Sequence, residues 1–262
     1  MQFLSPHDEE PEVAFAVSPD VDEDRPAVMV ARARELTTRY VGLDGMSLLR
    51  PLIEREFSGR LAVVSSFGAE SAVILAMAAE IDRTTPVLFL DTGKLFGETL
   101  RYRDRLIARL GLADVRTIQP DAAQLSAADS KGMLWVHDPD SCCRVRKIEP
   151  IARALRGFDA WVTGRKRYHG ADRVALPIFE WDKSGRIKIN PLAEWSRARV
   201  EEEFIGRNLP RHPLEADGYL SIGCMTCTDR VQPDEDQRAG RWRGLAKSEC
   251  GIHLPAVGRV EP

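Results

Sequence analysis

The sequence lacks any uninterrupted apolar run of the roughly 18 to 20 residues that a membrane-spanning helix needs. Its N-terminus is acidic and lacks the basic and then apolar order of a secretory signal. It also lacks a basic excess, since 37 Lys and Arg stand against 40 Asp and Glu. We therefore expect a cytoplasmic globular protein that binds neither a membrane nor a long nucleic acid.

Charge is unevenly distributed along the 262 residues. Residues 1–25 hold eight acids and one base, so the net charge of −3 for the whole chain leaves +4 on the remainder. Because this stretch has several prolines and no helical or strand periodicity, we predict a disordered acidic arm over 1–25. The mildly basic remainder suits a small polyanionic ligand. We divide it into a main domain, 26–235, and a C-terminal segment, 236–262.

Short apolar runs alternate with helical patterns in the main domain. Apolar spacing predicts helices at 28–40 and 46–57, then at 69–81, 98–110, 142–155 and 196–205. Strands are predicted at 61–66, 86–90, 115–118 and 159–163, followed by a pair of short strands at 178–181 and 187–189. This order predicts an α/β fold: a mostly parallel sheet with helices on both faces and a ligand at the carboxyl ends of the strands.

The loop after the first predicted strand reads Ser-Ser-Phe-Gly-Ala-Glu-Ser over residues 65–71. Small residues let the backbone approach a ligand, and the N–H groups at a helix N-terminus favour an anion. The loop lacks the lysine of a P-loop and the three glycines of a dinucleotide fingerprint. It resembles the phosphate loop of the adenine-nucleotide pyrophosphatases, which implies an adenine-nucleotide alpha-hydrolase-like (Rossmann-like) fold. An ordinary strand-to-helix turn is the alternative.

Five cysteines are an odd number, and a reducing compartment disfavours disulfides, so metal or redox chemistry explains them better. Cys142 and Cys143 are adjacent, whereas Cys224 and Cys227 form a C-x-x-C pair. Four thiolates fit zinc or an iron-sulfur cluster, and adjacent cysteines favour the wider cluster because neighbours on a helix diverge by about 100°. Buried unliganded thiols or a structural zinc site are the alternative. Cys250 stands apart and is a candidate nucleophile.

Basic residues occur close to these cysteines in the sequence. Lys147 lies about one helical turn beyond Cys143, and residues 238–247 contain four bases and no acid. Such charges would bind an anion and favour the thiolate of Cys250 as the attacking form. An exposed basic surface is the alternative for this run.

Seven motifs occur in the order SSFGAES, LDTGKLFGET, CCRVRK, TGRKRYHGADR, GCMTC, RAGRWRG and ECGIH. Together they resemble the assimilatory sulfonucleotide reductases over about residues 45–255, and the paired cysteines are similar to those of the iron-sulfur branch, adenylyl-sulfate reductase. The resemblance implies one 4Fe-4S cluster per chain, bound by Cys142, Cys143, Cys224 and Cys227. The stretch after Gly164 departs from the family pattern at 168–170, which leaves the substrate contacts among its bases open.

The resemblance also implies roles for individual residues. Cys250 and His253 would be catalytic. Substrate contacts would come from the loops at the strand ends and from the basic residues, namely Ser65, Ser66, Gly68, Glu70, Ser71, Asp91, Thr92, Gly93, Lys147, Gly164, Arg167, Arg173, Arg238 and Arg241.

The function implied is thioredoxin-dependent reduction of adenylyl sulfate (APS) to sulfite and AMP through an S-sulfocysteine on Cys250. The partner would be thioredoxin or a glutaredoxin-like dithiol, and a homo-oligomer is left open. The alternatives are the same reaction on 3'-phosphoadenylyl sulfate (PAPS), a tRNA thiolase of the ATP-pyrophosphatase type, and a redox or zinc-dependent binding module. Since Cys250 must meet both substrate and a protein partner, we predict a mobile tail, with Cys250 far from Cys142 and Cys227 when no substrate is bound.

Overall fold

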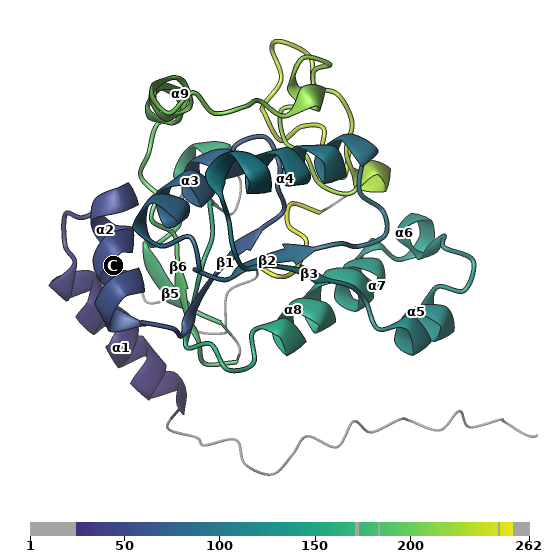
Figure 1. The fold of residues 1–262 in the computed structure, drawn as a ribbon. Helices are drawn as coiled ribbons and strands as arrows, with labels where there is room; N and C mark the ends of the chain where they lie inside the picture. Colours follow the sequence, from purple (N-terminus) through teal and green to yellow (C-terminus); the bar gives the residue numbers. More distant parts are fainter. Residues whose placement is uncertain (1–24, 171–172, 183, 246, 254–262) are drawn as a thin grey trace, which may run out of the picture.

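A six-stranded sheet forms the centre of the molecule in the computed structural model, which describes residues 25–170, 173–182, 184–245 and 247–253 (Figure 1). The strands follow the spatial order β3-β2-β1-β4-β6-β5, and only β5 is antiparallel to its neighbour. They are β1 (Leu61–Ser65), β2 (Val87–Leu90), β3 (Val115–Ile118), β4 (Ala160–Val162), β5 (Phe179–Trp181) and β6 (Ile187–Ile189).

Successive side chains of the central strands point into two different cores, as the two-residue period of a strand requires. In β1, Leu61 and Val63 belong to the larger core, whereas Ala62 belongs to the core on the opposite face. In β2, Phe89 and Leu88 divide in the same way. Because both faces are covered, these strands are apolar throughout rather than alternating with polar residues.

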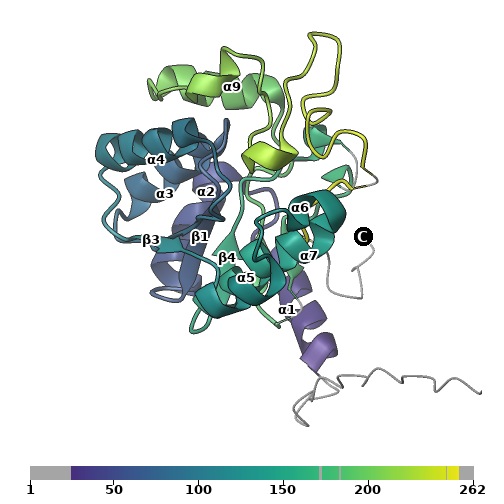
Figure 2. The ribbon, with the colours of Figure 1, turned by 90° about the vertical axis from the view of Figure 1, so that its right-hand side faces the viewer.

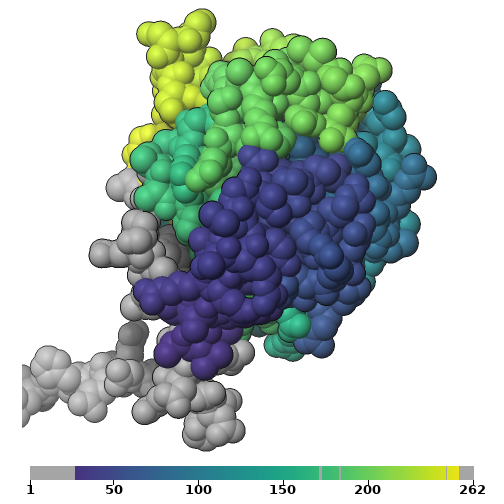
Figure 3. Space-filling view, turned by 90° about the vertical axis from the view of Figure 1, so that its left-hand side faces the viewer, coloured from purple at the N-terminus to yellow at the C-terminus, as the bar shows by residue number. Residues whose placement is uncertain are grey.

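Helices cover both faces of the sheet. Helices α3 and α4 pack on the larger core and α8 lies on the other face, whereas α5, α6 and α7 group together on the side of the molecule that faces the viewer in Figure 2. Helices α1 and α2 (purple) lie in the middle of the side of the molecule seen in Figure 3. The α-helices are α1 (Arg25–Arg39), α2 (Gly45–Pro51), α3 (Ser71–Ile81), α4 (Gly97–Leu110), α5 (Ala122–Ala128), α6 (Leu134–His137), α7 (Pro139–Cys143), α8 (Glu149–Ala154) and α9 (Arg197–Gly206).

Short non-α turns join several of these helices. Within the described ranges, two are π-helical, η1 (Leu52–Glu56) and η2 (Arg144–Ile148), and three are 3-10 turns, η3 (Arg167–His169), η5 (Pro213–Glu215) and η6 (Met225–Cys227). The second π-helical turn joins α7 to α8, so that one continuous helical segment runs from the paired cysteines to the sheet.

The predicted strands and the mostly parallel sheet are confirmed. The helix predicted at 69–81 begins instead at Ser71, because residues 66–70 remain a loop, and α5 and α6 were not predicted. No helix among the described residues is long and apolar enough to cross a lipid bilayer. The predicted acidic arm lies outside the described residues except for Arg25, at which α1 begins.

Candidate active site

A cavity of about 210 Å³ opens where β1, β2 and β4 end. These are neighbouring parallel strands, so their carboxyl ends lie at one edge of the sheet, which is where α/β proteins of this kind bind ligands. Six cationic side chains and two acidic ones line the cavity: Lys147, Arg165, Lys166, Arg173, Arg238 and Arg241 against Glu70 and Glu249. The surplus of positive charge favours a ligand with more than one negative charge.

The loop between β1 and α3 forms one wall of this cavity. Phe67 adopts a left-handed backbone conformation (φ 49°) and is fully buried, with its ring edge against Phe89. A Cβ atom at Gly68 would lie 3.1 Å from the carbonyl oxygen of Ile222, so only glycine fits here without displacing the facing loop. The loop is therefore fixed in shape at the N-terminus of α3, as an anion-binding loop requires.

Glu70 ends this loop and joins three segments of the chain. Its carboxylate accepts hydrogen bonds from Lys166 (2.6 Å), Tyr168 (2.7 Å), His169 (3.0 Å) and Gln237 (3.0 Å). Burial alone would raise the pKa of Glu70, but Lys166 and the other donors hold it well below its usual range. Because four protein donors already bond to this carboxylate, Glu70 is better placed to position the surrounding residues than to contact substrate directly.

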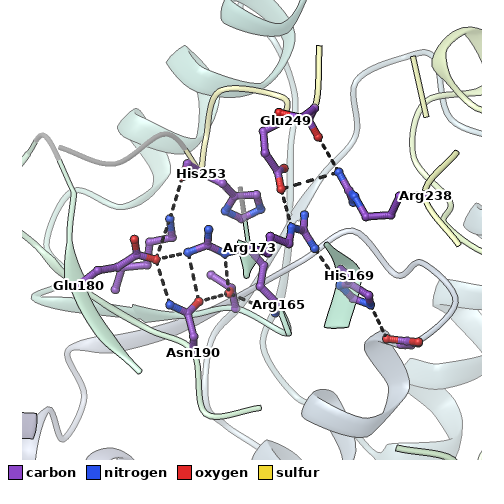
Figure 4. Close-up of polar contacts among 12 residues, drawn as sticks. Arg165, His169, Arg173, Glu180, Asn190, Arg238, Glu249 and His253 are labelled. Atoms are coloured by element: carbon purple, nitrogen blue, oxygen red, sulfur yellow. Dashed lines mark hydrogen bonds and ion pairs between the residues drawn. The ribbon is translucent and has the colours of Figure 1, made fainter. Parts of the chain in front are cut away.

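A second polar cluster joins residues of β5 and β6 to Arg165, which follows β4 and lines the cavity (Figure 4). Arg165 and Lys188 both form ion pairs with Glu180, and Asn190 also donates to that carboxylate at 2.9 Å. Burial, with Arg165 nearby, lowers the pKa of Lys188 to about 8. Two buried cations thus share one carboxylate, which makes this end of the sheet electropositive.

The cysteine tail, which we define as residues 247–253, contributes four residues to the lining of the cavity, Glu249, Cys250, Ile252 and His253. Cys250 is buried against Cys143 and Trp242, with Cys227 at the edge of the same cluster. The prediction that Cys250 lies far from Cys142 and Cys227 without substrate is therefore wrong for Cys227. The sequence did not reveal how many contacts hold the tail in place.

Both sides of Cys250 contribute to docking. Glu249 forms a buried ion pair with Arg173, and Arg238 donates to the carbonyl of Ser248 at 2.7 Å (Figure 4). Beyond the cysteine, the ring of His253 stacks on Trp161 with 6.2 Å between ring centroids. Burial, followed by the surrounding cations, lowers the pKa of His253, so the imidazole is neutral at physiological pH.

The two cysteine pairs come from different elements of the fold. Cys142 and Cys143 end α7, whose N-terminus is capped by Asp138, and Cys224 precedes the 3-10 turn that carries Cys227. Cys224 lies 3.2 Å from the hydroxyl of Thr92. Burial raises the pKa of the Cys142 thiol, Arg146 opposes this, and Cys224 and Cys227 add to it, so the thiols share one environment.

The spacing of these thiols distinguishes two kinds of metal site. A single tetrahedral zinc would bring its sulfur ligands to about 3.8 Å from one another. Among the described residues, the group of three ligand atoms within 4.8 Å of one another consists of Glu249, Cys250 and His253 and contains none of the other four cysteines. Within the described part of the chain, no three of those four thiols therefore lie within 4.8 Å of one another.

The compact group of Glu249, Cys250 and His253 is unsuited to a metal despite its spacing. Its carboxylate is already paired with Arg173, and four cationic residues contribute to the lowered pKa of His253. A divalent cation would have to enter this positive environment and displace an arginine from Glu249. The arrangement instead favours attack by the thiol on an anionic ligand.

Lys147 interacts electrostatically with three thiols of the site, those of Cys224, Cys250 and Cys143. Burial would lower its pKa, but Cys224, Cys250 and Cys143 outweigh this and raise it, so the ammonium stays charged. Its place follows from the π-helical turn η2, whose wider backbone is common at functional sites. Within that turn Arg146 pairs with Asp129 at 2.7 Å, while Lys147 lines the cavity.

Most of the predicted catalytic and substrate-binding residues line the cavity, but Asp91, Gly93 and Arg167 do not. Asp91 accepts a hydrogen bond from the backbone of Gly93 (3.0 Å) and forms a turn outside it. Arg167 turns away to the carbonyl of Leu176 and to Glu194, leaving Arg165 and Lys166 to face the cavity. Those that line it are Ser65, Ser66, Gly68, Glu70, Ser71, Thr92, Lys147, Gly164, Arg173, Arg238, Arg241, Cys250 and His253.

Comparison with known proteins gives a consistent picture. A family model described as phosphoadenosine phosphosulfate reductase domain matches residues 60–230. The chain is 50% identical to an adenosine 5'-phosphosulfate reductase of Mesorhizobium japonicum over 87% of this chain and 90% of the relative. It is 36% identical to a phosphoadenosine 5'-phosphosulfate reductase of Gloeobacter violaceus over 88% of this chain and 98% of the relative.

Solved structures show the same fold. The crystal structure of phosphoadenylyl-sulfate (PAPS) reductase from Candida auris in a phosphate complex superimposes with a TM-score of 0.65 at 27% identity, covering 77% of this chain and 97% of that chain. An FMN adenylyltransferase of Candida glabrata, with a TM-score of 0.53 and 14% identity over 84% of this chain and 78% of that chain, shares the fold alone.

Proposed function

Because the chain belongs to the phosphoadenosine phosphosulfate reductase family, we propose that it reduces adenosine 5'-phosphosulfate (adenylyl sulfate) to sulfite and AMP. The observation that carries this proposal is the position of Cys250, buried at a cavity lined by six cationic side chains and beside Lys147. A thiol held against an anion-binding cavity has the geometry required for nucleophilic attack on an anionic substrate.

In the first step, the thiolate of Cys250 attacks the sulfur of the sulfate group. A new S–S bond forms, the bond between that sulfur and the bridging oxygen breaks, and AMP departs with the electron pair. The cavity cations Lys147, Arg238 and Arg241 would hold the sulfate and offset the charge that develops on the leaving group. Neutral His253 would orient the substrate rather than supply charge.

In the second step, a dithiol partner such as thioredoxin or a glutaredoxin-like protein attacks the sulfur of Cys250. Sulfite leaves, a mixed disulfide forms, and the second thiol of the partner resolves it, so the dithiol supplies both electrons. Because Cys250 is buried when docked, the tail has to leave the cavity before this partner can reach it. Such a partner belongs in a reducing compartment, consistent with the cytoplasm.

We also propose that Cys142, Cys143, Cys224 and Cys227 hold one 4Fe-4S cluster per chain. Two observations support this assignment: Cys224 and Cys227 both act electrostatically on Cys142, and no three of these thiols lie within 4.8 Å of one another among the described residues. When bound, such a cluster supplies fixed charge and structural support beside Lys147. The dithiol already provides two electrons, so neither step requires another electron source.

The same chemistry on PAPS is the second candidate, because relatives of that name align over nearly their whole length. The higher identity to the Mesorhizobium enzyme supports adenosine 5'-phosphosulfate as the substrate. Initial rates of sulfite production on the two nucleotides at equal concentration would separate the candidates. A preference for the 3'-phosphorylated nucleotide would refute our choice of substrate.

The central test uses substrate labelled with radioactive sulfur. In the absence of reductant, the protein should retain one label per chain on Cys250, and reduced thioredoxin should then release it as sulfite. Cys250→Ser should retain no label yet bind AMP with unchanged affinity, which separates loss of the nucleophile from loss of the pocket. Sulfite production by Cys250→Ser at the rate of the unmodified protein would disprove the mechanism.

A further inference from the structure

Glu249 stands next to the nucleophile but contacts the cavity wall. Its side chain is 7% exposed and forms an ion pair with Arg173. The same carboxylate oxygen lies 3.7 Å from Arg238. Both arginines line the cavity in which an anionic substrate would bind, so a residue of the tail neutralises part of that wall.

A chain of hydrogen bonds continues from this ion pair to the phosphate loop (Figure 4). Arg173 donates to Nδ1 of His169 at 3.0 Å, because an arginine can only donate. The proton of the neutral imidazole is therefore on Nε2, which donates to Glu70 at 3.0 Å. Glu249, Arg173, His169 and Glu70 thus connect the cysteine tail to the loop that ends β1.

Because these hydrogen-bonded residues are buried, only a negatively charged side chain fits at position 249. Burial alone would raise the pKa of Glu249, but Arg173 and Arg238 lower it, so the side chain is ionised in the docked tail. A neutral side chain there would leave Arg173 buried at its Nε without a counter-charge, and such unpaired buried charges are strongly disfavoured. The ion pair therefore favours the docked position of the whole tail.

We propose that Glu249 is a positioning residue: its carboxylate holds Cys250 in the cavity through its interactions with Arg173 and Arg238. These interactions must break before the reductant can reach the thiol. Given the two-step reaction proposed above, the same ion pair would speed the first step and oppose the second. In the docked tail, this ion pair holds the residue next to the nucleophile against the cationic wall of the cavity.

Protection of Cys250 against iodoacetamide in the resting protein provides the direct test. Tryptic peptide 248–259 contains this cysteine and no other, so mass spectrometry reports its alkylation alone. Loss of a buried charge-assisted hydrogen bond should raise the alkylation rate of Glu249→Gln roughly 10- to 150-fold. The control, Glu201→Gln on α9, removes the carboxylate of an exposed ion pair with Arg211 and should leave the alkylation rate of Cys250 unchanged.

The two half-reactions, measured separately, distinguish positioning from a purely structural role, because a structural role would slow both of them alike. In Glu249→Gln, labelling of Cys250 by substrate should slow by at least tenfold, while release of sulfite from already labelled protein by reduced thioredoxin should not slow. Glu249→Asp keeps the charge on a shorter side chain. Its rates of alkylation and of labelling by substrate should lie between those of the unmodified protein and of Glu249→Gln. If Glu249→Asp folds but Glu249→Gln does not, Glu249→Asp alone tests the role: its Cys250 should be alkylated faster, and labelled by substrate more slowly, than in the unmodified protein.

An alkylation rate in Glu249→Gln within twofold of the unmodified protein would overturn this role, as would equal slowing of both half-reactions. Failure of the proposed function has a different signature. In that case the unmodified protein would take up no label from the nucleotide, whereas the contrast in alkylation between Glu249→Gln and Glu201→Gln would persist.

Discussion

Gly251 follows the nucleophile and offers a sharp test of how tightly the tail fits. Its backbone is left-handed (φ +88°), and an added Cβ would lie 2.6 Å from Cδ1 of Ile148. In Gly251→Ala the backbone strain costs about 1–2 kcal/mol. Because Cδ1 is the end of a flexible side chain, it can move aside for about another 1 kcal/mol. Together these lower the docking equilibrium constant of the tail roughly 30- to 150-fold.

The assay is again the protection of Cys250 against alkylation, taken as the ratio of its rate in unfolded and native protein. Ile148→Val removes Cδ1, so the double variant should recover about fivefold of the lost protection but not the part due to backbone strain. Gly42→Ala introduces the same kind of strain (φ +76°) at a position with no atom within 4 Å. It should lower the free energy of unfolding without exposing Cys250.

A fall in protection of less than fivefold in Gly251→Ala would refute the reasoning, because it would mean that the tail does not need this backbone conformation to dock. Failure of Ile148→Val to restore any protection would refute the steric part alone. Similar exposure of Cys250 in Gly42→Ala would show that general destabilisation, rather than the fit of Gly251, controls the tail.

Three other changes test other parts of the molecule. Asp129→Ala leaves the Arg146 guanidinium buried without its partner and should lower the free energy of unfolding by about 3–5 kcal/mol in urea titrations; a loss under 1 kcal/mol would contradict this. Burial raises the pKa of Glu215 to about 7, so its ionisation destabilises the fold as pH rises through that value. Glu215→Gln should therefore be more stable than the unmodified protein by about 1–2 kcal/mol at pH 8 but not at pH 5, with equal stability at pH 8 the contrary result. Cys224→Ser should lose bound iron and acid-labile sulfide whereas Cys250→Ser keeps both, and full iron content in the first would remove Cys224 from the cluster.

Most of the sheet could be predicted because its strands are short apolar runs separated by clear helical patterns. Gly111 ends α4 with a left-handed cap (φ 65°), as its position after an amphipathic helix predicts. Helix α5 was not predicted because none of its residues is buried, so no apolar periodicity marks it. Asp121, whose carboxylate accepts from the backbone of Ala123 and Gln124, was the available signal.

The identities of the cavity residues were predictable from motifs, but the directions of their side chains were not. Arg165 and Arg167 lie two residues apart in the same basic stretch, and only the packing of Glu180 and Glu194 determines which faces the cavity. The docked tail depends in the same way on partners distant in sequence. Glu249 meets Arg173, and the ring of His253 meets Trp161, pairings that no local pattern encodes.

The π-helical turn between Cys143 and Glu149 has a consequence for the evolution of this site. Deleting one residue between 144 and 148 would restore regular helical bonding and rotate the paired cysteines by about 100° relative to α8. The length of this turn is therefore as much a determinant of the site as the identity of its side chains. A homologue with all four cysteines but a one-residue gap here should hold them in a different arrangement, which makes the gap itself a marker of divergence.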